Sequence, residues 1–244
     1  MTTSSGVEPP SSADTVELLG LVAQLEQTAF ARLAADSRIA PTIEQRLALT
    51  RFAAAAVQRR DRVLARIEEL GADPVAAIGQ FDGVLEEFDV RTEPSTWWER
   101  LLKSYVGYGV ADDFCRLAAQ GLDEQSRQLV LEVLDDASHS ELAVAELDAA
   151  GAGDEVLTSR LALWGRRLVG EALSVVQRLL AQRPGLERCV RAGAAQAAAA
   201  QAAAASASSA AAPTASAPPN APAKIFGELT AQHTRRMARL GLTA

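Results

Sequence analysis

Asp136 and His139 are the residues whose types and spacing most directly indicate chemistry, because they stand three positions apart in the run LVLEVLDDASHSELAV. Side chains at positions i and i+3 project from the same face of a helix. In carboxylate-bridged di-metal sites, single glutamates on two helices and a Glu-x-x-His pair on each of two others converge on the axis of a helical bundle. The pair is thus half of such a ligand set, although solvated or hydrogen-bonded pairs share the same spacing.

Two glutamates occupy positions where the helical period requires an apolar residue. Glu26 stands four residues after Val22, and Glu171 stands three residues after Leu168. Burying an unpaired charge costs several kcal/mol, so an inward carboxylate requires a cation, a proton or hydrogen bonds. A bound metal is one solution, and a boundary position from which the carboxylate reaches water is another.

An arginine lies in the core register of the second predicted helix. The inward positions of this helix include Phe52, Ala56, Arg59, Val63 and Ile67, with spacings of three and four. A guanidinium in such a register needs a carboxylate partner, because an unpaired buried charge is strongly destabilising.

Adjacent acidic residues, Asp112 and Asp113, follow in the helix that carries Trp97 and Trp98. Both compete for the inward direction of that helix. The helical period alone does not decide which of the two carboxylates faces the core.

The composition predicts that helices position these residues. Hydrophobic residues make up 48% of the 244 residues and aromatic residues only 5%, while β-branched runs of strand length are absent. Capping residues, glycines and prolines delimit the predicted helices, which cover residues 14–37, 42–70, 74–89, 95–120, 123–150 and 155–183. Long helices with short connections predict an all-α antiparallel bundle.

The ends of the chain differ from this body in composition. Residues 1–13 are predicted to be disordered, and residues 14–191 to form the helical bundle. Residues 192–223 are rich in alanine, serine and proline, which predicts a linker whose first part can be helical. Residues 224–244 resume an amphipathic pattern, so we expect a C-terminal helix that packs back onto the bundle.

The net charge of −7 gives no electrostatic argument for nucleic-acid binding. Local basic faces could still form at two clusters, Arg59, Arg60, Arg62 and Arg66 in one, and Arg235, Arg236 and Arg239 in the other.

Cellular location is predicted from the cysteines and from the absence of targeting patterns. Cys115 and Cys189 lack metal-type spacing, which favours free thiols in a reducing compartment. The first residues carry no secretory signal, and the alanine tract is interrupted by glutamine and serine, so no membrane span is expected. We therefore predict a cytoplasmic protein, with homo-oligomerisation left open.

Six segments together resemble the ferritin-like proteins grouped with the di-iron tRNA hydroxylase that oxidises the isopentenyl side chain of methylthio-isopentenyl-adenosine. The similarity covers most of the chain outside the linker, and no single segment would be specific. The segments are LEQTAFARLAADSRIAPT, ELGADP, KSYVGYGVADDFCR, LVLEVLDDASHSELAV, LALWGRRLVGEAL and LTAQHTRRMARLGL.

The resemblance implies a ferritin-like bundle with two metal half-sites, iron as cofactor and tRNA as substrate. Glu26 matches the carboxylate of the first helix, and Asp113 is the match implied on the third. Asp136 and His139 match the carboxylate and histidine of the later helix. If active, such a protein would be an iron-dependent monooxygenase.

The second helix departs from the family pattern, because Ala56 and Arg59 stand where that pattern places Glu-x-x-His. A methyl group cannot ligate a metal, and a guanidinium is a permanent cation. The hypothesis is that Arg59 supplies the positive charge of the missing metal and pairs with Glu26, Asp136 or Glu171. This hypothesis predicts a protein that is non-catalytic or that binds a metal only weakly.

The alternative is a surviving hydroxylase. Glu26, Asp113, Asp136 and His139 would then hold at least one metal, and a second histidine could come only from His233 in the C-terminal segment.

Overall fold

The computed structural model describes residues 9–135, 137–207 and 221–244, and all regular structure in this part of the chain is helical. The all-α prediction is therefore confirmed. The helices are α1 (Ser12–Ile39), α2 (Ile43–Glu69), α3 (Pro74–Gly79), α4 (Glu86–Arg91), α5 (Trp97–Leu102), a π-helical turn (Lys103–Gly107), α6 (Tyr108–Ala119), α7 (Glu124–Leu134), α8 (Ala137–Gly151), α9 (Glu155–Gln182), α10 (Pro184–Ala207) and α11 (Ala221–Arg239).

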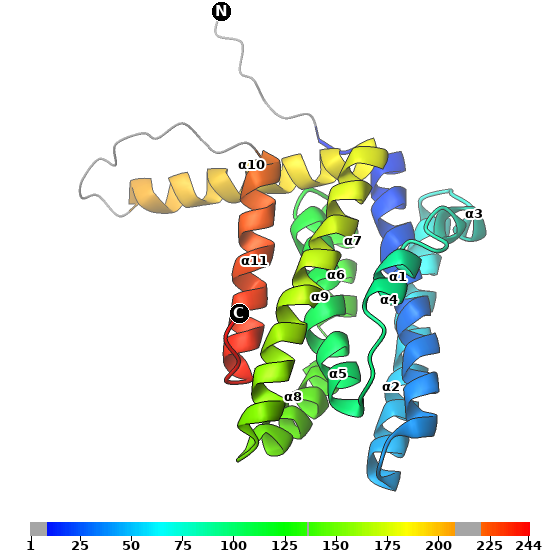
Figure 1. The fold of residues 1–244 in the computed structure, drawn as a ribbon. Coiled ribbons are helices and arrows are strands. Elements are labelled where there is room, and N and C mark those ends of the chain that lie inside the picture. The colour runs from blue at the N-terminus through cyan, green and yellow to red at the C-terminus, as the bar shows by residue number, and fades with distance from the viewer. Residues whose placement is uncertain (1–8, 136, 208–220) are drawn as a thin grey trace, which may run out of the picture.

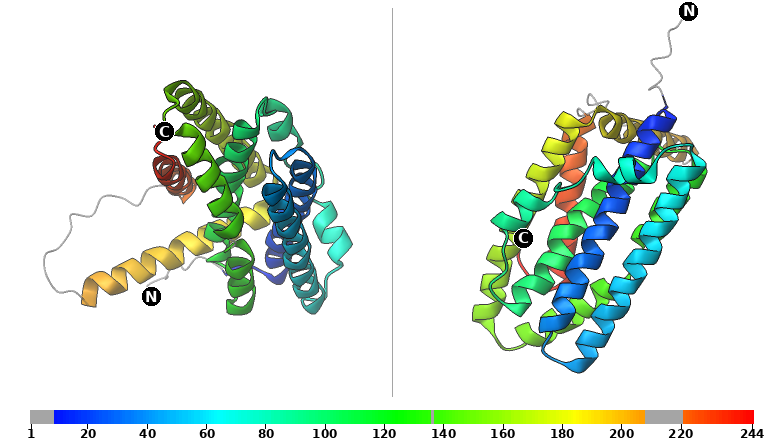
Figure 2. Two further views of the ribbon diagram at one scale, coloured as in Figure 1. Left: turned by 90° about the horizontal axis from the view of Figure 1, so that it is seen from below. Right: turned by 90° about the vertical axis from the view of Figure 1, so that its right-hand side faces the viewer.

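Long helices form the walls of a bundle around a shared apolar core (Figure 1). Helices α1 and α2 run antiparallel along one side, α6 passes through the middle, and α9 and α11 form the opposite side (Figure 2). Leu18, Leu102, Phe114, Leu168 and Leu229 come from different helices and are all buried in this core. Burial of such side chains contributes about 1.5–3 kcal/mol each, so the core stabilises the bundle.

Helix starts depend on side-chain caps. A capping box between Thr42 and Gln45 begins α2, at the position predicted from the sequence. Helix α1 begins at Ser12, two residues before the start predicted from the sequence, because a capping box pairs Ser11 with Asp14. Asp14 thus lies inside the first turn of the helix.

Three of the predicted helices are interrupted. The helix predicted over residues 74–89 divides into α3 and α4, and the next one lies over residues 95–120. There the π-helical turn separates α5 from α6. A Cβ added at Gly107, the last residue of this turn, would lie 2.9 Å from the ring of Phe88, so the turn and α4 are in close contact.

The third interruption falls at Asp135, between α7 and α8. The carbonyl of Leu134 accepts a hydrogen bond from the guanidinium of Arg116, whereas in a continuous helix an amide four residues later would use it. This long-range bond offers a partner for a carbonyl at the helix end, which helps to explain why α7 stops there.

The C-terminal part contains two further helices. Helix α10 crosses one end of the bundle and continues to Ala207, through the first part of the segment whose composition predicted a linker (Figure 1). Alanine has the highest helix propensity, which accounts for this extension. Helix α11 packs against α6 and α9 with Ile225, Leu229 and Met237 buried.

No helix in the described ranges combines the length and the apolar character that crossing a bilayer requires.

Glycines allow α10 to approach the end of α6. A Cβ added to Gly121 would lie 2.3 Å from the carbonyl oxygen of Cys189, and one added to Gly193 would lie 2.7 Å from the carbonyl oxygen of Leu117. Both clashes involve backbone atoms, so they cannot be relieved by a side-chain rotation. Backbone shifts of this kind typically cost 1–3 kcal/mol.

We expect Gly121→Ala to lower the free energy of unfolding by about 2 kcal/mol, because α10 must move away from α6. Chemical denaturation followed by circular dichroism measures the change. Gly170→Ala is the matched control, since that exposed helical position has no atom within 4 Å of an added Cβ. An equal effect of both substitutions would contradict the close crossing.

Candidate functional site

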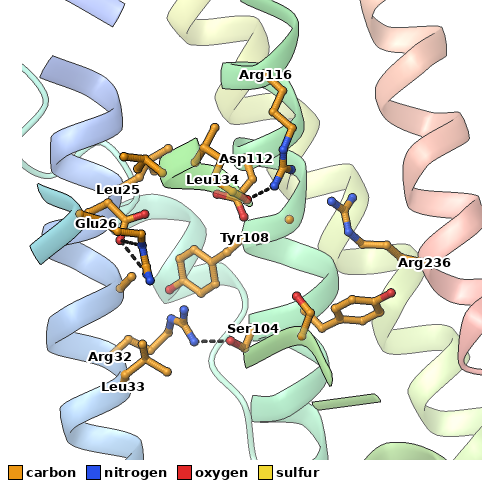
Figure 3. Close-up of a pocket in the computed structure, with 16 residues that line it drawn as sticks. Leu25, Glu26, Arg32, Leu33, Ser104, Tyr108, Asp112, Arg116, Leu134 and Arg236 are labelled. Atoms are coloured by element: carbon orange, nitrogen blue, oxygen red, sulfur yellow. Dashed lines mark hydrogen bonds and ion pairs between the residues drawn. The ribbon is translucent and has the colours of Figure 1, made fainter. Parts of the chain in front are cut away.

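A polar cavity of about 110 Å³ lies between α1, α2, α6 and the helices next to them (Figure 3). Four guanidinium groups and two carboxylates reach it. The charged residues that line it are Glu26, Arg32, Arg59, Asp112, Arg116 and Arg236. Its position in the middle of the bundle makes it the candidate site, because metal and ligand sites of helical bundles are built there from side chains of facing helices.

The first ion pair at the cavity joins α2 to α1. Arg59 Nε and Nη2 lie 3.0 and 2.9 Å from Glu26 Oε2, and the two side chains are only 17% and 8% exposed. The helical period had placed both residues inward, and the structure brings them together. The Glu26 carboxylate therefore faces a permanent cation.

The second ion pair joins α6 to α11. Arg236 donates from both terminal nitrogens to the carboxylate of Asp113, and Arg116 Nη1 lies 3.2 Å from Asp113 Oδ1. Two arginines thus bind one buried carboxylate. This two-nitrogen contact is the strong form of the arginine–carboxylate interaction.

Asp112 lines the cavity itself, whereas its neighbour Asp113 is directed toward Arg116 and Arg236. Burial raises the pKa of the Asp112 carboxyl, against the opposing effect of Arg116 and Arg236. The helical period left open which of the two aspartates faces the core. In the structure Asp112 lines the cavity, and Asp113 binds the two arginines.

Arg32 was not singled out by sequence reasoning. Its Nη1 donates to Ser104, and its guanidinium lies 4.5 Å from the ring centroid of Tyr108. The Tyr108 hydroxyl in turn donates to Asp89 Oδ1 at 2.6 Å. Arg32 follows Leu25 and Ala29 with spacings of four and three residues, so the helical period that singled out Glu26 could have found it as well.

The remaining predicted site residues lie elsewhere or outside the described part. Glu171, on α9, is 3.9 Å from Arg91 and does not line the cavity with Arg59, so the geometry does not support it as a partner of Arg59. Asp136 and the side chain of His139 fall outside the residues that the structure describes.

His233 is buried in α11, and neither ring nitrogen has a hydrogen-bond partner among the described residues. Burial, with the nearby Arg236 charge, lowers the pKa of His233 from 6.5 to about 4. Protonation therefore favours the unfolded state, in which the imidazole titrates near its ordinary pKa.

We expect the free energy of unfolding to decrease as the pH falls from 6.5 toward 4, and this contribution to be constant above 6.5. His233→Leu should flatten the profile in that interval, because the unfolded state then binds no extra proton at this position. Urea denaturation at a series of pH values measures the slope. Identical slopes in the two proteins would contradict a neutral buried His233.

The donor set in the described part of the chain does not fit a metal centre. No group of three or more His, Cys, Asp or Glu side chains there could hold a metal ion. The two predicted carboxylate ligands with described side chains, Glu26 and Asp113, are bound to arginines. Guanidinium groups cannot serve as ligands, because they carry no free lone pair.

Comparison with known proteins gives one positive finding. A family model described as a ferritin-like domain of actinomycetes matches residues 11–193. No curated protein matches the chain.

Proposed function

Because the chain belongs to the ferritin-like domain family of actinomycetes, we propose that it is a non-catalytic member in which ion pairs stand at the position of one metal half-site. The contact between Arg59 and Glu26 carries this proposal. It joins the first-helix carboxylate expected to bind a metal to a residue of the second helix that cannot do so.

Electrostatics support the replacement. A metal ion in such a bundle neutralises the carboxylates that surround it, and a guanidinium supplies one positive charge without an open coordination position. Asp113 is likewise bound by Arg116 and Arg236. A carboxylate that is satisfied in this way gains little from a metal, so oxygen chemistry is not expected at these residues.

The arginine clusters do not support tRNA as a partner. Arg60, Arg62 and Arg66 each lie in an ion pair with a carboxylate. On α11, Arg235 pairs with Glu228, while Arg236 is turned into the interior. The local basic faces that the sequence left possible are therefore largely neutralised, and RNA binding usually needs cations that are free to bind phosphates.

Iron content tests the proposal. After anaerobic incubation with ferrous iron and removal of the excess, elemental analysis should find substoichiometric iron in the natural protein. About two irons per chain would contradict the proposal and favour the surviving iron-dependent hydroxylase.

A double variant provides the matched comparison. Ala56→Glu with Arg59→His restores the Glu-x-x-His pattern on α2, and we expect it to gain iron. Iron in the double variant alone would support the replacement of the half-site. Iron in neither protein would show that the remaining donors do not converge on a metal position.

A further inference from the structure

Arg32 differs from the other arginines at the cavity because no ion pair joins it to a carboxylate among the described residues, although the charges of Asp36 and Asp112 act on it from farther away. Arg59 is paired with Glu26, and both Arg116 and Arg236 are paired with Asp113. Arg32 donates only from Nη1, to Ser104, and its Nε is buried without a hydrogen-bond partner among the described residues. A buried guanidinium nitrogen without a hydrogen-bond partner is costly away from water.

The surroundings of Arg32 suit an anion. The Tyr108 ring lies against the guanidinium, with 4.5 Å between the Arg32 Cζ and the ring centroid, and holds it at the wall of the cavity (Figure 3). A planar guanidinium whose orientation is fixed can donate two parallel hydrogen bonds to a carboxylate. The guanidinium carries one positive charge, so a monoanion suits it best.

The size of the cavity limits the ligand. Its volume of about 110 Å³ corresponds to a few water molecules at roughly 30 Å³ each. A second, smaller cavity of about 20 Å³ has an apolar lining and shares Leu25 and Tyr108 with the first. A short apolar substituent next to the charged group would therefore meet a compatible wall.

We propose that the polar cavity binds a small carboxylate, whose charge is held by Arg32 and whose short apolar group lies toward Leu25 and Tyr108. This inference goes beyond the proposed function, because the Arg59–Glu26 pair is complete without a ligand. Asp112, which also lines the cavity and has no ion pair among the described residues, disfavours the anion through its own charge.

Titration of the full-length protein with acetate and with butyrate tests the inference, with chloride at equal ionic strength as reference and phosphate as the competing oxyanion. Chemical-shift changes in NMR spectra report saturable binding. We expect butyrate to bind more tightly than acetate, and both more tightly than phosphate.

Variants of Arg32 and Asp112 show how each residue contributes to carboxylate binding. Arg32→Gln should weaken carboxylate binding at least tenfold, and Arg32→Lys, which keeps the charge but not the paired donors, should weaken it less. Asp112→Asn should bind as tightly as the natural protein or more tightly. Circular dichroism checks that each variant is folded. If Arg32→Gln is unfolded, the carboxylate affinity of Arg32→Lys is compared with that of the natural protein instead.

Four outcomes would overturn the inference. They are the absence of saturable binding by either carboxylate, equal affinity in both Arg32 variants and the natural protein, tighter binding of phosphate than of carboxylates, and loss of binding in Asp112→Asn. The last result would indicate a ligand with a positive group instead of a simple anion.

Discussion

Replacing Arg59 by alanine is expected to lower the free energy of unfolding at pH 7 by about 3–5 kcal/mol. The substitution leaves the Glu26 carboxylate without the guanidinium that lies 2.9 Å away, in a position where the side chain is only 8% exposed. Removing one partner of a buried ion pair is costly, because the other charge stays in a medium that solvates it poorly. Urea denaturation followed by circular dichroism measures the change.

Arg60→Ala is the control for this prediction. Arg60 is the next residue on α2, and its ion pair with Asp61 involves a carboxylate that is 58% exposed, so its loss should cost less than about 1 kcal/mol. The double substitution of Arg59 and Glu26 by leucine should recover much of the loss, since both charges of this pair are then removed together. A loss in Arg59→Ala no larger than in Arg60→Ala would contradict a buried, mutually dependent pair.

The inward direction of Glu26 and Arg59 was predictable, because both follow the period of long helices. Ala56 is fully buried and Arg59 is mostly buried, as the core register of the second helix indicated. What the period did not supply was the partner of each charge. Glu171 follows an apolar stripe equally well, yet it is directed toward Arg91 on α4. A period gives the face of a helix but not the helix that packs against it.

The interruptions at residues 103–107 and at Asp135 were not predictable in the same way. Both regions carry ordinary helical residues, and the structure places a long-range contact at each, from Phe88 at Gly107 and from Arg116 at Leu134. Tertiary contacts of this kind override local propensity and leave no local signal in the sequence.

The contribution of α11 to the candidate site was also outside what the pattern indicated. Arg236 belonged to a cluster that resembled a surface basic face, and it instead reaches Asp113, 123 positions earlier in the chain. Together with Met237, which contacts the position of Gly165, it fixes α11 against the bundle. The packing of a C-terminal helix onto the bundle was predicted, but the position of Arg236 in the wall of the cavity was not.

Replacing Asp113 by asparagine should therefore have a second large effect, a loss of about 3–5 kcal/mol in the free energy of unfolding together with loosening of α11. The neutral amide cannot balance Arg116 and Arg236, whose charges then remain at the contact of α6 with α11. Urea denaturation measures the stability, and limited proteolysis measures the exposure of α11.

Glu228→Gln is the control for this contact, because Glu228 pairs with Arg235 on the exposed side of the same helix. We expect a loss below about 1 kcal/mol and no change in proteolysis. Equal behaviour of the two variants would mean that apolar contacts alone hold α11 in place. A larger loss in Asp113→Asn would instead show that the charged contact of Asp113 with Arg116 and Arg236 helps to hold α11 against α6.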